Sequence, residues 1–159
     1  MKEVSGNLLD CEYDVIAHQT NCTTRGPAKG LAADIFRKFP YADTYKKRKN
    51  TDFKHEAGTV ELMGDGKKQR FVANMYAQYE PGKIKRGIED TIKKRQKWFT
   101  VCLQELHAEM KVRKLTSVAF PYQIGCGLAR GNWPRYKKML KSFAKEAERD
   151  GITTYLITF

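Results

Sequence analysis

The sequence has no apolar run that approaches the ~20 residues of a membrane-spanning helix. Its first five residues contain no apolar stretch of the kind that directs secretion. The four cysteines, at positions 11, 22, 102 and 126, form no C-x-x-C pair, and the three histidines have no H-x-x-x-H spacing. These absences argue against a structural zinc site and against a catalytic metal. We therefore expect an intracellular protein, cytoplasmic or nuclear, with no metal, no cofactor and no membrane partner.

Acidic residues are few relative to basic ones. There are 18 Asp and Glu against 30 Lys and Arg, which gives a formal net charge of +12 at pH 7. Such a charge attracts anions and speeds their encounter with the protein. The alternative is that the charge serves solubility alone. The charge thus favours an anionic partner, such as a nucleic acid or a nucleotide, without identifying it.

What the sequence does contain is an alternation of strand-like and helix-like segments along 159 residues, a length typical of one domain. The apolar spacing predicts strands at 15–18, 59–63, 70–76, 117–121 and 153–159. It predicts helices at 30–39, from 41 to about 50, at 88–110, and from the N-cap Asn132 to Gly151. This order indicates an α/β layered fold with a mixed sheet. Ligands of such folds bind beyond the carboxyl ends of the strands.

Two of the loops that follow expected strands are suited to phosphate. Residues 19–30 are small and polar and lead into a helix at Gly30, where free N–H groups favour anions. In the second loop, 124–132, Gly125, Gly127 and Gly131 allow the backbone to form a nest of N–H donors. Either loop could also be an ordinary connection. Together, at one edge of a sheet, they suit a diphosphate.

Several segments resemble the macro domain family, in order along nearly the whole chain. They are Gly6-Asn7-Leu8-Leu9, residues 15–22, Lys29-Gly30-Leu31-Ala32, Phe120-Pro121 and Ile124-Gly125-Cys126-Gly127-Leu128. The likeness is greatest to small stand-alone members, which include terminal ADP-ribose glycohydrolases and ADP-ribose 1''-phosphate phosphatases. The resemblance implies that residues 1–159 form a single macro domain, a three-layer αβα sandwich with a mixed central sheet. It also implies an ADP-ribose cleft at the strand ends.

The resemblance assigns binding roles to individual positions. Asn7 stands where the family has an Asp that accepts a hydrogen bond from adenine, and Asn21 matches the Asn that holds the distal ribose. Phe159 either covers the adenine or packs in the core. The ligand-binding residues expected in this way are Gly6, Asn7, Leu8, Asn21, Ala28, Lys29, Gly30, Leu31, Gln78, Ile124, Gly125, Cys126, Gly127, Leu128, Ala129 and Phe159.

The sequence leaves the chemistry open. The glycohydrolase-like members use a lysine and an aspartate where this chain has Gln78 and Ala129, which disfavours a lysine adduct with the ribose. His18 and Asn21 are the candidate catalytic residues, because His18-Gln19-Thr20-Asn21-Cys22 resembles the His-x-x-Asn-Cys segment of the phosphatases. The alternative for His18 is a hydrogen-bonded histidine beneath the loop. No C-x5-R motif follows Cys22 or Cys126, which disfavours a cysteine nucleophile.

Three functions follow from these patterns. The first is an enzyme that acts on an ADP-ribose derivative, as an ADP-ribose 1''-phosphate phosphatase or an ADP-ribosyl hydrolase. The second is a non-catalytic reader of ADP-ribose, poly(ADP-ribose) or ADP-ribosylated protein. The third is an RNA-binding module. It would use the basic clusters at 36–55 and 83–97, of which the first is interleaved with Tyr41, Tyr45 and Phe53.

Overall fold

The residues that a computed structural model describes, 1–85 and 89–159, form one mixed sheet of six strands in the order β1-β6-β5-β2-β4-β3. The strands are β1 (Lys2–Ser5), β2 (Val15–Asn21), β3 (Thr59–Met63), β4 (Phe71–Gln78), β5 (Ser117–Pro121) and β6 (Thr153–Thr158). Neighbouring strands are parallel except β3, which pairs antiparallel with β4 as the expected hairpin. The sheet therefore has most of its carboxyl ends at one edge.

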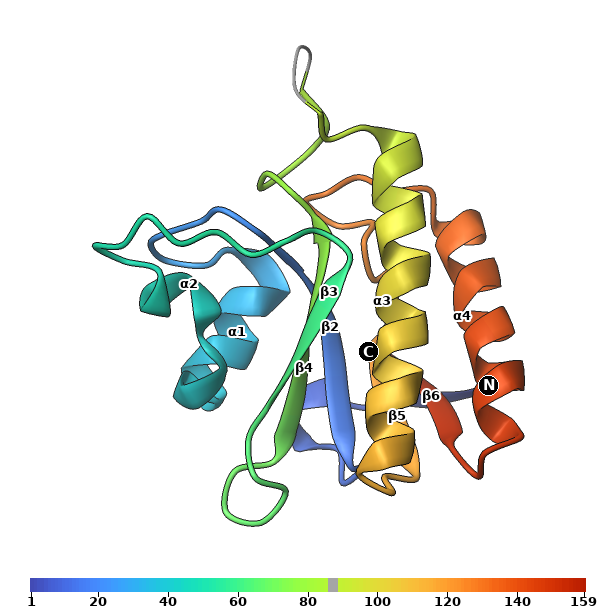
Figure 1. The fold of residues 1–159 in the computed structure, drawn as a ribbon. Helices are drawn as coiled ribbons and strands as arrows, with labels where there is room; N and C mark the ends of the chain where they lie inside the picture. The colour runs from blue at the N-terminus through green and yellow to red at the C-terminus, as the bar shows by residue number, and fades with distance from the viewer. Residues whose placement is uncertain (86–88) are drawn as a thin grey trace.

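Helices cover both faces of this sheet (Figure 1). The helices α1 (Gly30–Lys38) and α2 (Thr44–Lys47) lie on one face, and α3 (Ile92–Val112) and α4 (Trp133–Glu148) lie on the other. Along β2, Val15 and Ala17 pack into the core beneath α3 and α4, whereas Ile16 packs into the core beneath α1. A strand buried on both faces reads as a continuous apolar run. The structure thus confirms the α/β class and the three-layer αβα sandwich with a mixed sheet.

Most expected elements are present, with changed boundaries. Strand β2 runs to Asn21, three residues beyond the prediction. The helix expected from 41 to about 50 is a 3-10 turn at Pro40–Ala42 followed by the short α2. Helix α3 begins at Ile92, after its N-cap Thr91, and the predicted start at 88 lies outside the described residues. Asn132 caps α4 as predicted, because its side chain accepts a hydrogen bond from the Arg135 N–H.

Strand β1 was not predicted, because its residues, KEVS, are mostly exposed and form no apolar pattern. It pairs with the edge of β6. A 3-10 turn at Leu8–Asp10 follows it. None of the helices within the described residues is both long and apolar enough to cross a bilayer.

The sheet opens between β2 and β5. These two strands pair only through Val15 with Val118 and Ile16 with Ala119. Beyond those pairs, β2 leads to α1 on one face of the sheet and β5 leads to α4 on the other. A ligand crevice forms at such a switch point, outside the carboxyl ends of the strands. The two loops predicted to bind phosphate flank this switch point.

Candidate functional site

The β5–α4 loop presents free backbone donors. The N–H groups of Gly125, Gly127, Leu128 and Ala129 have no acceptor among the described residues. Their neighbours hold the loop in shape: the Cys126 N–H donates to the Gln123 carbonyl at 2.9 Å, and the Gly131 N–H donates to the Gly125 carbonyl at 3.0 Å. Clustered amides of this kind form an anion-binding nest.

Two of the three glycines are required by the backbone itself. Gly125 has φ +77°, and a Cβ there would lie 2.6 Å from the Tyr136 ring. A Cβ at Gly131 would lie 2.5 Å from the Gly125 carbonyl oxygen. Gly127 differs, because it is exposed and a Cβ there would meet no atom within 4 Å. A small side chain at 127 would therefore have room in the protein itself and would project toward a molecule bound at the loop.

The β2–α1 loop is shaped by Asn21. Its side chain is 5% exposed, and its Oδ1 accepts hydrogen bonds from the N–H groups of Thr23 and Thr24 at 3.1 and 2.9 Å. The loop then enters α1 at Gly30. Its N-cap residue, Lys29, makes no side-chain capping bond, so the first amides of the helix remain open to an anion. The two loops meet where Leu128, which is 61% exposed, lies 3.2 Å from the position of a Cβ on Gly30.

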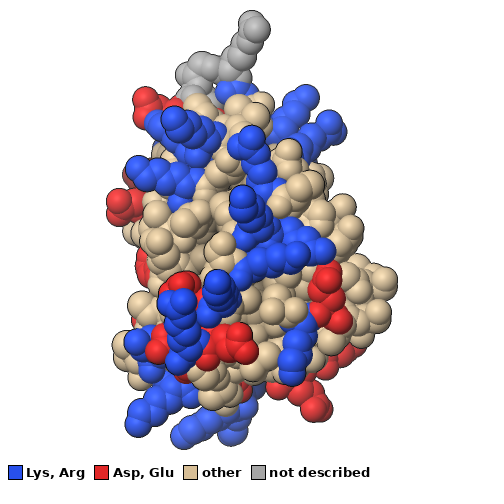
Figure 2. Space-filling model, turned by 90° about the vertical axis from the view of Figure 1, so that its right-hand side faces the viewer, with Lys and Arg blue, Asp and Glu red and all other residues tan. Residues whose placement is uncertain are grey.

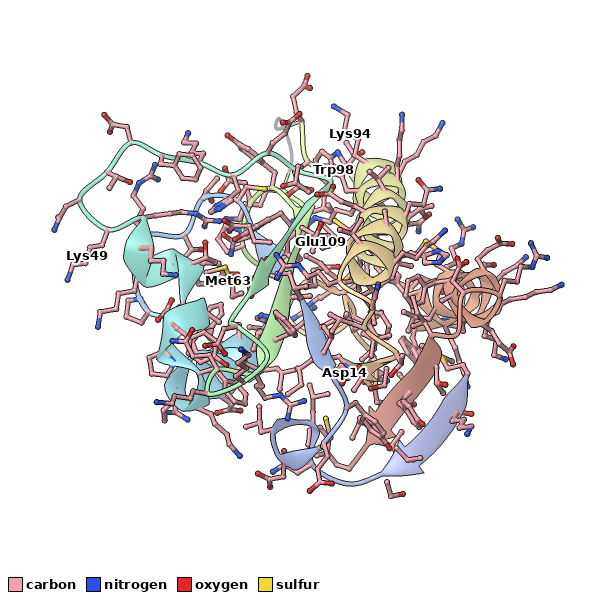
Figure 3. All side chains as sticks on the ribbon, turned by 60° about the horizontal axis from the view of Figure 1, so that its bottom comes forward. Asp14, Lys49, Met63, Lys94, Trp98 and Glu109 are labelled. Atoms are coloured by element: carbon pink, nitrogen blue, oxygen red, sulfur yellow. The ribbon has the colours of Figure 1, made fainter. Side chains whose placement is uncertain are left out.

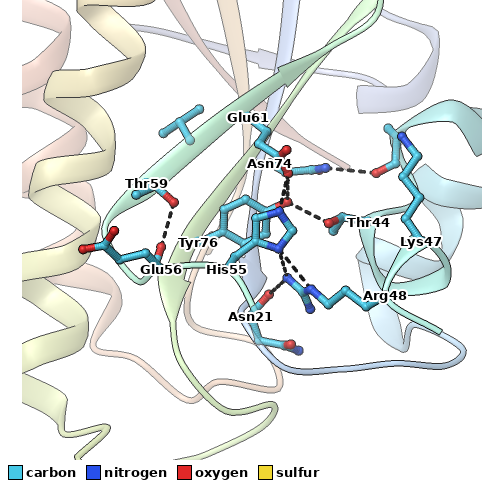
Figure 4. Close-up of polar contacts among 12 residues, drawn as sticks. Asn21, Thr44, Lys47, Arg48, His55, Glu56, Thr59, Glu61, Asn74 and Tyr76 are labelled. Atoms are coloured by element: carbon cyan, nitrogen blue, oxygen red, sulfur yellow. Dashed lines mark hydrogen bonds and ion pairs between the residues drawn. The ribbon is translucent and has the colours of Figure 1, made fainter. Parts of the chain in front are cut away.

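A buried arginine supports the β2–α1 loop from beneath. Arg48 is 1% exposed, and its guanidinium donates to the carbonyl of Thr24 at 3.1 Å and to that of Asn21 at 2.7 Å. Figure 4 shows Arg48 between Asn21 and His55. The guanidinium also donates to Nδ1 of His55, whose Nε2 lies 2.7 Å from Oε1 of Glu61. The hydrogen bond from His55 is the main reason that the pKa of Glu61 is lowered.

A second buried arginine, Arg95, lies behind the loops that follow β4 and β5. Arg95, 3% exposed, forms a two-bond ion pair with the fully buried Asp90 (Nε–Oδ1 2.6 Å and Nη2–Oδ2 2.8 Å). Its guanidinium also donates to the carbonyls of Gly82 and Glu80 at 2.7 and 3.2 Å, and it reaches the Ala129 carbonyl at 3.5 Å. The loops after β4 and β5 are thus fastened together.

A pocket of about 390 Å³ lies at the far end of the same sheet edge. Gly6 and Asn7 line it, together with parts of β1, β6 and residues 10–13. Oδ1 of Asn7 already accepts a hydrogen bond from the Leu9 N–H at 3.0 Å, which caps the 3-10 turn. Phe159 follows β6 and is 87% exposed, so the core-packing alternative for this residue is wrong.

The predicted ligand-binding residues therefore gather at one edge of the sheet, but not all of them present side chains there. Leu8 and Ile124 are 1% and 4% exposed and belong to the core, so that only their backbone is available to a ligand. Gln78 is 8% exposed, and its amide is bonded to Gln19 (2.7 Å) and to the Glu80 carbonyl (2.9 Å). Gln78, expected among the ligand-binding residues, thus holds neighbouring residues of the site through its side-chain amide. Ala28, Lys29, Gly30 and Leu31 form the start of α1, and Cys126 and Ala129 are half-buried in the glycine loop.

The structure does not bring His18 to the cleft. It is 2% exposed, packs edge-on against Phe36, and places Nε2 2.6 Å from Oδ1 of Asn74. Burial lowers the pKa of His18 to about 4, so the ring is neutral near pH 7. This is the alternative that the sequence left open, a hydrogen-bonded histidine, and the prediction of an accessible acid or water-orienting base is wrong.

The cysteines of the site are not activated either. Burial raises the pKa of Cys22 to about 12 and that of Cys126 to about 11. Thiolate nucleophiles need the opposite shift. In the described part of the chain, no group of three or more His, Cys, Asp or Glu side chains is placed to hold a metal ion.

A carboxylate that sequence reasoning missed lies at the rim of the β2–α1 loop. Glu80, just after β4, is half-buried, and its Oε2 accepts a hydrogen bond from Oγ1 of Thr23 at 3.2 Å. The only sequence indication was its place in the loop that follows the expected strand 70–76.

The basic clusters are also not what the sequence suggested. They lie on opposite faces of the sheet: Lys49 extends from the end of α2, and Lys94 lies at the start of α3 (Figure 3). Arg48 and Arg95 are buried, and Lys94 pairs with Glu89 at 2.8 Å. Tyr45 is 5% exposed and Tyr41 is half-buried, so they do not form an exposed stacking surface with Phe53. Arg86 of the second cluster lies outside the described residues.

The sequence matches no protein-family model and no curated protein. Solved structures match it over almost its whole length. A protein of unknown function from Bacteroides thetaiotaomicron is 24% identical, with 100% of this chain and 99% of that chain covered and a TM-score of 0.71. The macrodomain of Mycobacterium tuberculosis DarG is 15% identical, with the same coverage and a TM-score of 0.71.

A mutant macrodomain of Oceanobacillus iheyensis, solved with ADP-ribose, is 16% identical, with 98% of this chain and 82% of that chain covered and a TM-score of 0.67. These likenesses show that the chain has the macrodomain fold.

Proposed function

We propose that the protein binds ADP-ribose, free or attached to protein, in the cleft between the β2–α1 and β5–α4 loops. The open N–H groups of Gly125, Gly127, Leu128 and Ala129 carry this proposal. They face the switch point together with the start of α1, so two sets of backbone donors converge on one place. A diphosphate matches that arrangement in charge and in its number of acceptors.

The two ends of the ligand would lie on either side of these donors. The pocket at Gly6 and Asn7, about 390 Å³, would take the adenine, with Phe159 beside it. The distal ribose would lie at Asn21, whose Nδ2 is left to donate because Oδ1 is used within the loop. The neighbour solved with ADP-ribose has the same fold, which supports ADP-ribose as the ligand.

Binding without turnover is the activity that this geometry favours. His18 is buried and neutral, the thiols of Cys22 and Cys126 have raised pKa values, and Gln78 holds its neighbours. The alternative form of the proposal is that the protein turns its ligand over, as an ADP-ribosyl hydrolase or an ADP-ribose 1''-phosphate phosphatase. Glu80 favours that form, because a carboxylate beside the Asn21 loop could orient a water.

Gly127→Val tests the cleft directly. Because a Cβ at 127 meets no protein atom within 4 Å and the residue is exposed, the variant should keep its thermal stability. It should bind ADP-ribose at least about tenfold more weakly by titration calorimetry, since the new methyl groups occupy the space above the amides. Ala108→Val, exposed on α3, is the matched control.

The same titration separates the candidate functions. Preference for ADP-ribose over AMP supports the diphosphate site, and equal affinity of the Gly127→Val variant and the wild type would sink it. Release of phosphate from ADP-ribose 1''-phosphate, or of ADP-ribose from modified protein, with loss of either in Glu80→Gln, would establish turnover.

A second candidate function is RNA binding, and one surface favours it. Figure 2 shows Lys and Arg side chains spread over the face that includes α4. A groove of about 540 Å³ between α3 and α4 is lined by Thr100, Gln104, Met139 and Ser142, among others. Residues three or four apart share a helix face. Exposed basic side chains therefore continue this groove toward the start of both helices: Lys93, Lys97, Arg135 and Lys138.

RNA binding would be tested by anisotropy with a labelled single strand at two salt concentrations. The double reversal Lys97→Glu/Lys138→Glu should weaken binding and reduce its salt dependence, because fewer counterions are released. Lys49→Glu/Lys54→Glu is the matched control, because both residues are exposed in the other basic cluster and Lys49 lies on the far side of the sheet. Equal losses in both variants would mean a diffuse effect of net charge. If poly(ADP-ribose) displaces the RNA and free ADP-ribose does not, poly(ADP-ribose) is the polymer that this basic surface prefers.

A further inference from the structure

The buried guanidinium of Arg48 lacks the usual partner of a buried arginine. Within the described residues no carboxylate lies at ion-pair distance from it. Four of its five N–H groups are directed to two carbonyls and one imidazole nitrogen, and its charge lies 5.3 and 5.5 Å from the ring centres of Tyr45 and Tyr76. Burial lowers the pKa of Arg48, and an arginine nonetheless stays charged. The site therefore holds a positive charge that is compensated only indirectly.

The geometry fixes the protonation of His55. Nε and Nη2 of Arg48 approach His55 Nδ1 at 3.0 and 2.8 Å. Both are donors only, so Nδ1 must accept and carries no proton. The ring proton is then on Nε2, which donates to Glu61 Oε1 at 2.7 Å. Neutral His55 thus connects Arg48 to the carboxylate of Glu61 through hydrogen bonds at its two ring nitrogens. The negative charge of Glu61 compensates that of Arg48 only through this ring.

The other groups around His55 do not titrate near neutral pH. Tyr76 of β4 stacks on the ring, with centroids 4.0 Å apart, and donates its hydroxyl to Glu61. Burial raises the pKa of Tyr76, and raises that of Tyr45, beside Arg48, to about 12. Cys22 is likewise neutral, and Lys47 acts on Glu61 only as a nearby positive charge. Phe53 closes the remaining side edge-on. His55 is thus the group in this cluster with an unprotonated ring nitrogen, Nδ1, that can take up a proton.

We propose that Arg48 is the positioning residue of the β2–α1 loop, and that protonation of His55 releases its hold and weakens ligand binding in the cleft. A proton on Nδ1 would turn the acceptor of Arg48 into a donor that faces a guanidinium. The pair of His55 with Glu61 would become stronger at the same time, so the fold is kept while the hold on the Asn21 and Thr24 carbonyls is lost. This inference rests on the proposed function, because affinity for ADP-ribose is its readout.

The other two histidines are not expected to contribute to the pH dependence of binding. His18 has a pKa of about 4 and remains neutral above pH 5.5. His107 lies on α3 against Phe143 of α4 and pairs with Asp150, away from the β2–α1 loop. The diphosphate of ADP-ribose stays ionised over the same range. A change in affinity between pH 8 and pH 5.5 that is lost in His55→Gln therefore reports on His55.

The experiment is titration calorimetry of ADP-ribose at pH 8, 7, 6 and 5.5, with thermal melting at each pH. The wild-type affinity should fall about tenfold from pH 8 to 5.5, in the range of ordinary coupling between sites. His55→Gln, which can still accept from Arg48 and donate to Glu61, should bind within about threefold of wild type at pH 8 and show no pH dependence.

Two arginine variants complete the set. Arg48→Lys has no planar fork to bridge two carbonyls, so its affinity at pH 8 should already be about tenfold lower and nearly flat with pH. Arg25→Lys is the matched control. Arg25 also donates to carbonyls, of Thr23, Thr51 and Phe53, but does not contact His55. It should keep the wild-type pH profile.

An unchanged pH profile in His55→Gln would overturn the inference, even if Arg48→Lys fails to fold. Loss of the profile in Arg25→Lys would overturn it too. If the wild type binds no ADP-ribose at pH 8, the proposed function fails, and this inference fails with it. A wild type that binds with the same affinity at every pH rejects the inference alone.

Discussion

Arg48 and Arg95 are both buried behind loops of the same cleft, yet their charges are compensated in different ways. Asp90 meets Arg95 through two short bonds and also accepts hydrogen bonds from the N–H groups of Tyr79 and Glu80 at 3.0 and 2.8 Å. Arg48 instead meets His55, and only through it Glu61. The β4 and β5 side is therefore fastened by a permanent ion pair. The β2 side is held by a partner that can be protonated.

Removal of Asp90 should produce the largest effect. Asp90→Asn leaves the buried charge of Arg95 without its counterion, and breaking a buried pair in this way costs about 3–5 kcal/mol. Urea unfolding at pH 7 measures the loss. Asp34→Asn, which breaks the exposed pair with Arg37, is the control, and a change below about 1 kcal/mol is expected there. A similarly small loss at Asp90 would contradict the difference drawn between the two arginines.

The pH dependence of stability should be separable from that of binding. The folded-state pKa of His18 is about 4, below the ordinary value of 6.5, because burial disfavours the charged ring. As the pH falls from 6.5 toward 4, the unfolded chain takes up this proton and the folded chain does not. Stability is therefore lost over that window, by up to about 3 kcal/mol.

His18→Gln should flatten the loss of stability between pH 6.5 and 4 in urea titrations. His55→Gln should leave most of that slope in place. A slope that survives in His18→Gln and disappears in His55→Gln would mean that folding and loop positioning respond to the same proton.

Arg48→Met should have a smaller effect on stability than Asp90→Asn. It leaves the carbonyls of Asn21 and Thr24 and Nδ1 of His55 without a donor, which costs about 1–3 kcal/mol, but it leaves no charge unpaired. Equilibrium unfolding of both variants under one set of conditions gives the comparison. A loss at Arg48 equal to or larger than that at Asp90 would show that its charge is better compensated than the contacts indicate.

The sequence predicted the parts of this molecule that have a repeating pattern. The apolar spacing in α1, α3 and α4, the hairpin of β3 and β4, and the cap at Asn132 are local features, and the structure has them. Strand β1 lacks such a pattern because an exposed edge strand buries little. The family resemblance, and not the residue pattern, indicated Gly6 and Asn7.

The two buried arginines could not be found in this way. Arg48 and Arg95 were counted with neighbouring lysines as exposed charge, because most lysines and arginines are exposed. Their partners are largely backbone carbonyls, which leave no mark on the sequence. For the same reason the end of β2 was misplaced. Gln19, Thr20 and Asn21 look like loop residues, but β4 pairs with them and Arg48 and Tyr45 cover the end of the strand.

The contact between Leu128 and Gly30 sets a dimension of the molecule. A methyl group on residue 30 would lie 3.2 Å from Cδ1 of Leu128, and the backbone there, at φ +62°, already disfavours any other residue. At this point the two loops are separated by little more than the side chain of Leu128, which is mostly exposed. A Cβ at position 30 would act as a spacer between the two loops. The missing side chain of Gly30 therefore helps to set the width of the cleft entrance.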